Sequence, residues 1–151
     1  MPQSLSRLIV HIIFSTKGRQ PFLADQSLRT EMHAVLGALC SKLDSPLMRV
    51  GGVEDHVHIA CHLGRTRAIS DLIKEIKRES SKWIKARRRP VPGFEWQSGY
   101  AAFSISPTHV DRLVEYIVDQ EEHHRKESFQ DELRRILTNY QLEWDERYLW
   151  V

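Results

Sequence analysis

Apolar and polar residues alternate along four segments of the chain, and this period of two predicts four β-strands. The segments cover residues 8–15, 47–50, 56–63 and about 100–104. In the first segment both alternating sets are largely apolar, so both faces of that strand are expected to be partly covered. Gly51 and Gly52 lie between the second and third segments and predict a tight reversal that joins two neighbouring strands.

Three other segments repeat apolar residues every three or four positions, which predicts amphipathic helices. They cover about 26–43, 68–88 and 107–125. The second helix ends before Pro90, Pro92 and Gly93, which cannot continue it, and Pro107 suits the first turn of the third. In the remaining extension, about 128–151, the part from 132 to 151 is too apolar for a free tail, so we expect it to dock on the domain or on a second subunit.

The order strand, helix, strand, strand, helix, strand indicates an α+β protein with the ferredoxin-like βαββαβ fold. We predict an antiparallel sheet with both core helices on one face and the other face open, followed by a C-terminal helix. A single domain, 1–151, is expected because the length and the 41% hydrophobic content suffice for one core. The core covers about 7–105, the C-terminal helix about 107–125 and an extension about 128–151.

Composition narrows the classes of function. No apolar run is long enough to cross a bilayer and residues 1–6 are polar, so we expect a cytoplasmic protein without a signal peptide. Cys40 and Cys61 are the only cysteines, which excludes a four-cysteine zinc site and a disulfide framework. The sequence has no GxxxxGK[ST] loop, so no nucleotide cofactor is expected.

Positive charge is concentrated in one predicted helix, although the formal net charge is only +2. Eight lysine and arginine residues lie between Lys74 and Arg89, against only Glu75 and Glu79. Such a stripe is typical of a surface that binds a polyanion, and it is equally typical of a solvated helix face. The candidate nucleic-acid contacts that we single out are Lys17, Arg19, Arg78, Lys82, Arg87, Arg88 and Arg89.

Two histidines on the third predicted strand form a candidate metal site. His56 and His58 are two positions apart, so they share one sheet face and have Cα atoms roughly 7 Å apart. At that separation both imidazoles can reach one ion that lies about 2 Å from each nitrogen. Such a pair on its own is more often two surface or hydrogen-bonded histidines than a metal site.

A tyrosine on the last predicted helix adds a second candidate. Tyr116 and Gln120 are four positions apart, so they share a stripe beside the packing face, and His123 and His124 follow near it. A tyrosine in this position usually lies at the edge of the core with its hydroxyl group in water. Together with a histidine pair, however, it offers a nucleophile beside a metal ion.

These segments resemble the single-tyrosine HUH transposases, the insertion-sequence-200-like enzymes and their relatives associated with repetitive extragenic palindromes. The matching segments, which cover nearly the whole domain in the family's order, are His11-Ile-Ile-Phe-Ser-Thr-Lys17, Gly51-Gly-Val-Glu-Asp-His-Val-His58, Ser80-Ser-Lys-Trp83, Trp96-Gln-Ser-Gly-Tyr100, Tyr116-Ile-Val-Asp-Gln120, Glu122-His-His-Arg125 and Ser128-Phe129. The resemblance implies that His56, His58 and Gln120 bind a divalent metal, Mg²⁺ or Mn²⁺. It also implies that Tyr116 is the catalytic nucleophile.

The same resemblance implies a reaction and its partners. Tyr116 would attack single-stranded DNA at hairpin-bearing ends, form a 5′-phosphotyrosine and free a 3′-hydroxyl for rejoining. A homodimer is expected, because two ends must be cut and each chain offers one nucleophile, which could serve its own site or that of the partner. His11, His123 and His124 are candidates for supporting contacts. Either of the last two could replace Gln120 as third ligand.

Two other functions fit the sequence. A nucleic-acid-binding module of the same fold binds RNA or DNA without cutting it, and it places aromatic residues on the open faces of its central strands. The residues expected on that face here favour a metal site over base stacking, and they are Ile9, His11, Ile13, His56, His58 and Ala60. A former transposase that now serves its host as a nuclease on palindromic repeats would retain the same chemistry.

Overall fold

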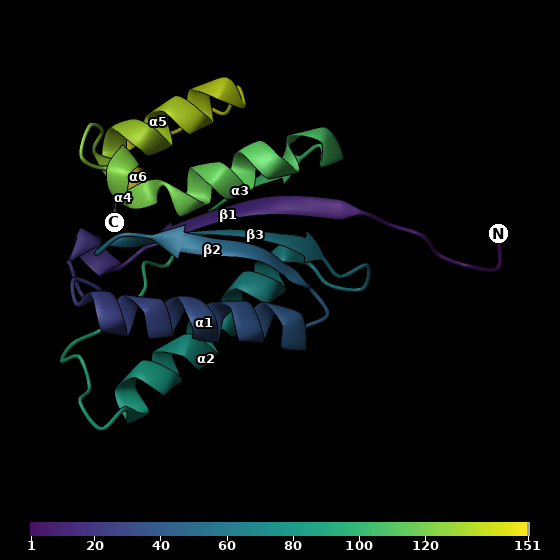
Figure 1. Cartoon of the computed structure of the whole chain (residues 1–151). Helices are drawn as coiled ribbons and strands as arrows, with labels where there is room; N and C mark the ends of the chain where they lie inside the picture. Colours follow the sequence, from purple (N-terminus) through teal and green to yellow (C-terminus); the bar gives the residue numbers. More distant parts are fainter. Residues whose placement is uncertain (151) are drawn as a thin grey trace.

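The computed structural model describes residues 1–150, and Val151 lies outside the described residues. Four strands form one antiparallel sheet in the order β2-β3-β1-β4. The strands are β1 (Leu8–Ser15), β2 (Leu47–Gly52), β3 (His56–Leu63) and β4 (Ala101–Ile105). Helices α1 (Gln26–Lys42) and α2 (Ile69–Ala86) pack on one face of this sheet (Figure 1). The predicted ferredoxin-like core, with both of its helices on one face, is therefore confirmed.

Local sequence sets the limits of these elements. The carboxylate of Asp25 accepts hydrogen bonds from the backbone amides of Ser27 and Leu28, which caps the start of α1. Helix α2 ends at Ala86, before the arginine run that leads into Pro90, as expected. One detail of the prediction is wrong: Gly51 and Gly52 belong to β2, and the reversal to β3 lies in residues 53–55. No helix within residues 1–150 combines the length and the apolar content needed to span a membrane.

The larger core lies between the sheet and helices α1 and α2. The strand residues that point to this side alternate along the sequence, as the period of two predicts. This core is built from Ile12, Phe14, Leu23, Leu28, Met32, Leu36, Cys40, Val50, Val57, Ile59, Cys61, Leu72, Ile73, Ile76, Ile84, Phe94 and Trp96.

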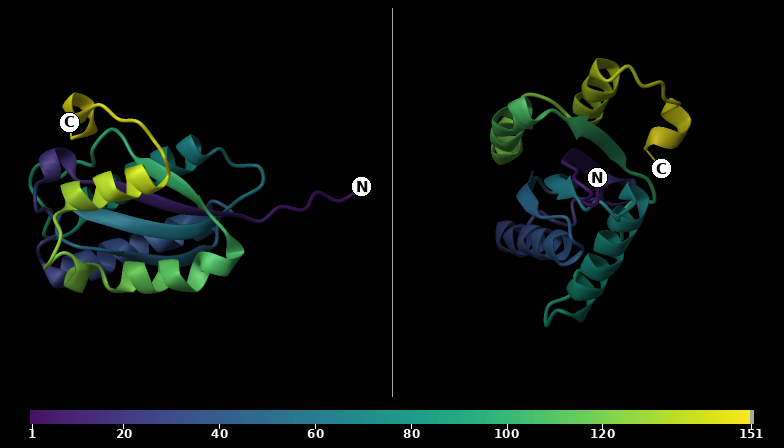
Figure 2. Two further views of the ribbon diagram at one scale, coloured as in Figure 1. Left: turned by 90° about the horizontal axis from the view of Figure 1, so that it is seen from above. Right: turned by 90° about the vertical axis from the view of Figure 1, so that its right-hand side faces the viewer.

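The second face of the sheet is covered, so the expectation of an open face is wrong for the described residues. Beyond a 3₁₀ turn at Pro107–His109, this cover consists of α3 (Val110–Val118), α4 (Gln120–His123), α5 (Phe129–Asn139) and α6 (Glu146–Leu149). Figure 2 shows these helices across the sheet from α1 and α2. Phe129, Leu133, Ile136 and Leu137 of α5 pack on Ile13 and Phe103, because both surfaces are apolar. The extension therefore docks on its own domain.

The predicted helix over 107–125 is divided in two. Asp119 departs from helical geometry with a ψ of 14° and separates α3 from α4. Leu113 and Ile117 of α3 pack against Ala60 in a third, smaller apolar cluster. The division redirects the chain after Val118, so α4 lies at the end of the sheet where β3 begins (Figure 1).

Close contact between β2 and α3 depends on the absence of a side chain at Gly51. A Cβ atom there would lie 2.4 Å from the backbone oxygen of Ile117 and 2.7 Å from its Cγ2. We expect Gly51→Ala to lower the free energy of unfolding by about 2 kcal/mol, because backbone atoms of α3 must shift. Urea denaturation measures this change, and Gly99→Ala is the control. A Cβ atom at Gly99 has no neighbour nearer than 3.9 Å, so an equal loss there would contradict the prediction.

Candidate functional site

His56 and His58 lie side by side on β3, on the face that α3 to α5 cover. Both side chains are fully buried, and their ring centroids are 5.2 Å apart. The alternation of β3 sends Val57 and Ile59 to the larger core and the two histidines to the opposite side. The structure thus places the pair together on the predicted sheet face.

Glu132 of α5 lies against both histidines, and the sequence analysis missed it. Its Oε1 atom is 3.1 Å from His58 Nε2 and 3.4 Å from His56 Nε2, and the side chain is completely buried. The same oxygen lies 3.1 Å from His124 Nε2. The sequence did contain a signal for this residue. Glu132 falls on the apolar stripe formed by Phe129, Leu133 and Ile136, where an acidic side chain requires partners.

Four side chains at this position can hold a divalent metal ion. One potential ligand atom from each of His56, His58, His124 and Glu132 lies within 4.8 Å of all the others. Imidazole nitrogens and a carboxylate oxygen are suitable donors for first-row divalent metals. Gln120 lies beside them, with its Oε1 atom 3.2 Å from His56 Nε2 and 3.0 Å from His124 Nε2. Two of the three candidates for the third ligand, Gln120 and His124, are therefore at the site.

The outer nitrogen of each β3 histidine has its own partner. His56 Nδ1 is 2.7 Å from Asp55 Oδ1, and His58 Nδ1 is 2.8 Å from His11 Nε2. These contacts orient both rings so that the Nε2 atoms face Glu132. His11, expected near the site from its position on β1, is thus brought into direct contact with His58.

The electrostatics of the cluster centre on one buried carboxylate. Burial opposes ionisation of Glu132, but hydrogen bonds from His124, His56 and His58 hold its pKa well below the usual 4.5. Burial also opposes the cationic form of His56, but hydrogen bonds to Asp55 and Glu132 raise its pKa to about 9. Burial lowers the pKa of His58 to about 4. The metal-free site therefore contains a Glu132–His56 ion pair, and His56 must release its proton before it can bind a cation.

Tyr116 reaches the same carboxylate from α3. Its hydroxyl group donates a hydrogen bond to Glu132 Oε2 and accepts one of 3.1 Å from Arg135 Nη2. Its ring centroid is 5.8 Å from that of His58. Burial and the negative charge of Glu132 raise the pKa of Tyr116, whereas the hydrogen bond from Arg135 lowers it. The phenol is therefore protonated and in place beside the histidines.

His123 lies on the outer side of Tyr116. Its Nε2 atom is 2.5 Å from Glu127 Oε2 and 3.4 Å from the Tyr116 hydroxyl oxygen. Arg135 links the group, because it donates to both Glu127 and Tyr116. His123 is therefore near the phenol but is not among the four residues that could hold a metal ion.

Most of the side chains predicted to contact nucleic acid instead contact other residues of the chain. Lys17 pairs with Glu95, Arg78 with Glu75 and Glu79, Lys82 with Glu79, and Arg87 with Glu31. The guanidinium of Arg19 lies 5.5 Å from the ring centroid of Trp150. Arg88 and Arg89 are exposed. The structure does not gather these residues around the histidine cluster.

Comparisons with solved structures support the fold described above. A crystal structure of a protein from Deinococcus radiodurans R1, assigned as a transposase, superimposes with a TM-score of 0.61 at 21% identity and covers 78% of this chain and 93% of its own. The structure of a REP-associated tyrosine transposase bound to a REP hairpin superimposes with a TM-score of 0.60 at 13% identity, over 81% of this chain and 72% of its own. No curated protein sequence matches.

A protein-family model provides the assignment. The family described as "Transposase IS200 like" matches residues 4–120. The matched segment contains β1 to β4, the histidine pair on β3, Tyr116 and Gln120. It ends before α5, so His124 and Glu132 lie outside it. The chain therefore belongs to the IS200-like transposase family.

Proposed function

We propose that this protein cuts and rejoins single-stranded DNA at hairpin-bearing ends through a covalent bond between Tyr116 and a 5′-phosphate. The observation that carries the proposal is the position of Glu132. Its carboxylate contacts the Tyr116 hydroxyl on one side and His56 and His58 on the other. An anion between a phenol and two metal-binding imidazoles occupies the position that a scissile phosphate needs. The hairpin in the REP-associated relative supports hairpin-bearing DNA as the substrate.

His56 and His58 are the proposed metal ligands, together with Gln120 or His124. Imidazole donors favour Mn²⁺ over Mg²⁺, which prefers oxygen ligands. When bound, the cation supplies positive charge that neutralises the phosphate and stabilises the transition state as a Lewis acid. The protein orients both rings through Asp55 and His11 before the ion binds.

The reaction exchanges one ester bond for another. The phenol oxygen of Tyr116 gives up its proton and forms a bond to phosphorus, the bond from phosphorus to the 3′-oxygen breaks, and that oxygen takes up a proton and leaves as a hydroxyl, so no net proton is consumed. Arg135 lies beside the phenol oxygen, where its charge favours the phenolate. Reversal by another 3′-hydroxyl rejoins DNA, and no nucleotide is consumed.

Entry of DNA requires movement of Glu132. The carboxylate fills the space between the phenol and the imidazoles, and the side chains of His56, His58, Gln120 and Glu132 are almost completely buried. A phosphate can reach these groups only when α5 withdraws this side chain. Tyr116 lies beside the histidines of its own chain, which supports attack in cis. A homodimer would then bring together two complete sites, one for each DNA end.

The proposal is tested with labelled, hairpin-bearing single-stranded DNA and Mn²⁺. We expect a protein–DNA adduct that survives denaturing electrophoresis and that disappears in EDTA. Label on the strand 3′ to the cut should remain with the protein, because the tyrosine holds the 5′-phosphate. DNA binding without an adduct would favour the non-catalytic module, and equal cleavage of a fully paired duplex would contradict the single-strand specificity. A host nuclease acting on palindromic repeats would give the same adduct.

The third metal ligand is resolved by three single substitutions. We expect Gln120→Ala to weaken Mn²⁺ binding by about 10- to 100-fold, because Gln120 Oε1 lies 3.2 Å from His56 Nε2. His123→Ala should change Mn²⁺ affinity less than about twofold, because His123 lies outside the cluster. Isothermal titration with Mn²⁺ measures all three variants. If His124→Ala causes the larger loss, His124 is the ligand and Gln120 only orients it.

A further inference from the structure

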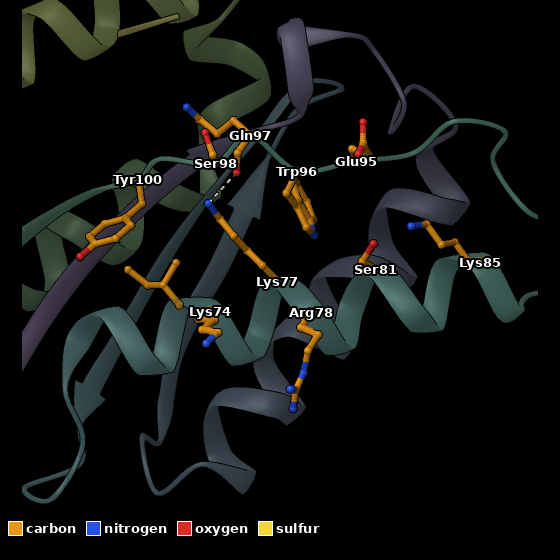
Figure 3. A pocket seen from close by; sticks show the side chains of 11 residues that line it. Lys74, Lys77, Arg78, Ser81, Lys85, Glu95, Trp96, Gln97, Ser98 and Tyr100 are labelled. Atoms are coloured by element: carbon orange, nitrogen blue, oxygen red, sulfur yellow. Dashed lines mark hydrogen bonds between the residues drawn. The ribbon is translucent and has the colours of Figure 1, made fainter. Parts of the chain in front are cut away.

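A groove separates α2 from the segment that leads into β4, and none of its lining residues belongs to the histidine cluster. It has a volume of about 370 Å³. One wall is formed by Lys74, Lys77, Arg78, Ser81 and Lys85 of α2, and the other by Glu95, Trp96, Gln97, Ser98 and Tyr100. Figure 3 shows Lys77 reaching across from the helix to the backbone near Gln97. We call this feature the α2 groove.

The α2 groove has an excess of positive charge. Its only carboxylate, Glu95, is bound by Lys17 at 2.9 Å. Lys74 and Lys85 are exposed and form no ion pair within residues 1–150. These two lysines therefore offer positive charge for an anionic ligand, and the charge of Lys85 also helps to lower the pKa of Glu95.

Lys77 holds the opposite wall in place. Its ammonium group donates hydrogen bonds to the backbone oxygens of Gln97 at 2.8 Å and Gly99 at 2.6 Å. Burial lowers its pKa to about 8, and no carboxylate of the described chain pairs with it. An anion in the groove would favour the charged form of Lys77. The groove is thus shaped by a lysine that itself lacks a negative partner.

The distribution of charge fits a strand better than an isolated phosphate. Lys74 and Lys85 are 11 positions apart on α2, which places their Cα atoms roughly 16 Å apart. That distance corresponds to several nucleotides. Tyr100 is 44% exposed on the same groove, and an exposed aromatic ring can stack on an unpaired base. Lysines in a row beside such a ring are typical of single-strand binding.

The groove continues toward the histidine cluster. Gln97, Ser98 and Tyr100 also line a second cavity, which extends under α5 to Ile13. Gln97 and Ser15 are joined by two hydrogen bonds, from Gln97 N to Ser15 O and from Ser15 N to Gln97 Oε1. Ser15 lies opposite His56 in the pairing of β1 with β3. A strand in the α2 groove can therefore pass around the β4 edge toward the site.

We propose that the α2 groove binds the phosphate groups of the single DNA strand that adjoins the cleaved bond, with Lys74 and Lys85 as its anchors. The inference rests on the proposed function, since it takes single-stranded DNA as the substrate. Of the sequence-based candidates only Arg78 lines the groove, whereas Lys82 lies on the same helix but outside the groove and pairs with Glu79.

The test compares lysines of one helix. A labelled hairpin oligonucleotide with a single-stranded flank is titrated in EDTA, which prevents cleavage, at several KCl concentrations. The double substitution Lys74→Ala and Lys85→Ala should raise Kd about tenfold and reduce the salt slope by roughly 1.4, which corresponds to two single-strand phosphate contacts. Lys82→Ala, the matched control, should change Kd less than about twofold. Equal effects in both variants, or none in the double variant, would overturn the proposal.

Two further measurements separate this inference from the proposed function. An oligonucleotide without the flank should bind the double variant and the wild-type protein equally. If the double substitution raises the Kd for duplex DNA more than the Kd for the flanked oligonucleotide, a single-strand groove is excluded. Mn²⁺ affinity should be unchanged in the double variant, because the lysines lie outside the histidine cluster. If the wild-type protein forms no adduct yet shows the lysine dependence, the proposed function fails while the groove assignment stands.

Discussion

Tyr116→Phe should eliminate the covalent protein–DNA adduct, with a loss of at least about 10³-fold that takes the signal below detection. Phenylalanine retains the ring that packs beside His58 and His11 but has no oxygen to bond to phosphorus. Single-stranded DNA binding should remain within about threefold of wild type, because the basic α2 groove is unchanged. Denaturing electrophoresis measures the adduct, and anisotropy measures binding.

Tyr140→Phe is the matched control for this experiment. Tyr140 stacks on Phe103 of the sheet, with ring centroids 4.5 Å apart, and its hydroxyl group donates to the backbone oxygen of Ser104. Neither contact involves Tyr116 or the histidine pair, so Tyr140→Phe should retain full adduct formation. An adduct that persists in Tyr116→Phe would place the nucleophile elsewhere, and peptide mapping would identify the residue.

Glu132→Gln should have the largest effect on stability. The substitution removes a buried anion and leaves the charge of His56 without one of its two partners. We expect the free energy of unfolding of the metal-free protein to fall by about 3 kcal/mol near pH 6, as measured by urea denaturation. Glu121→Gln, at an ion pair with Arg29 in which the glutamate side chain is 55% exposed, should cost less than about 1 kcal/mol. Unchanged stability in Glu132→Gln would contradict a buried ion pair.

The pH dependence gives an independent check on the same pair. The pKa of Glu132 is lowered on folding. Its carboxylate therefore stabilises the folded state above about pH 4.5, and this contribution is lost as the pH falls below that value. The pKa of His56 is raised from 6.5 to about 9, so its stabilisation is complete below 6.5 and is lost as the pH rises through 9. In the metal-free wild-type protein this pair should therefore contribute most to the free energy of unfolding between about pH 4.5 and pH 6.5. Glu132→Gln should reduce both the fall in unfolding free energy at acidic pH and its fall at alkaline pH.

The parts of the fold that follow a local period were predictable. The alternation of residues 56–63 correctly separated Val57 and Ile59, in the larger core, from the two histidines on the other face. The helical periods of α1 and α2, and the proline signals after α2, gave these elements to within two residues. These features depend on neighbours in the sequence, which is why the sequence alone contains them.

The cover on the second face could not be derived in the same way. Packing of α5 on the sheet joins Leu133 and Phe129 to Ile13 and Phe103, which are separated by many residues. Amphipathicity showed that the extension must dock, but it did not identify the surface. Glu132 was missed for this reason, since its role depends on which strand α5 covers. Similarly, the pairing of Arg78 and Arg87 with acidic residues depends on side-chain geometry that composition does not reveal.

The residues around the cluster come from distant parts of the chain, with His56 on β3, His124 after α4 and Glu132 on α5. A cation bound by His56, His58 and Gln120 or His124 would therefore act as a cross-link between β3 and the segment around α4. By mass action, a cation at one hundred times its Kd adds about 2.7 kcal/mol to the stability of the folded state, provided that the unfolded chain does not bind it. Melting temperature and hydrogen exchange in the segment around α4 then become readouts of metal concentration. A chelator would loosen the protein first at its C-terminal helices, far in sequence from the strand that carries the histidine pair.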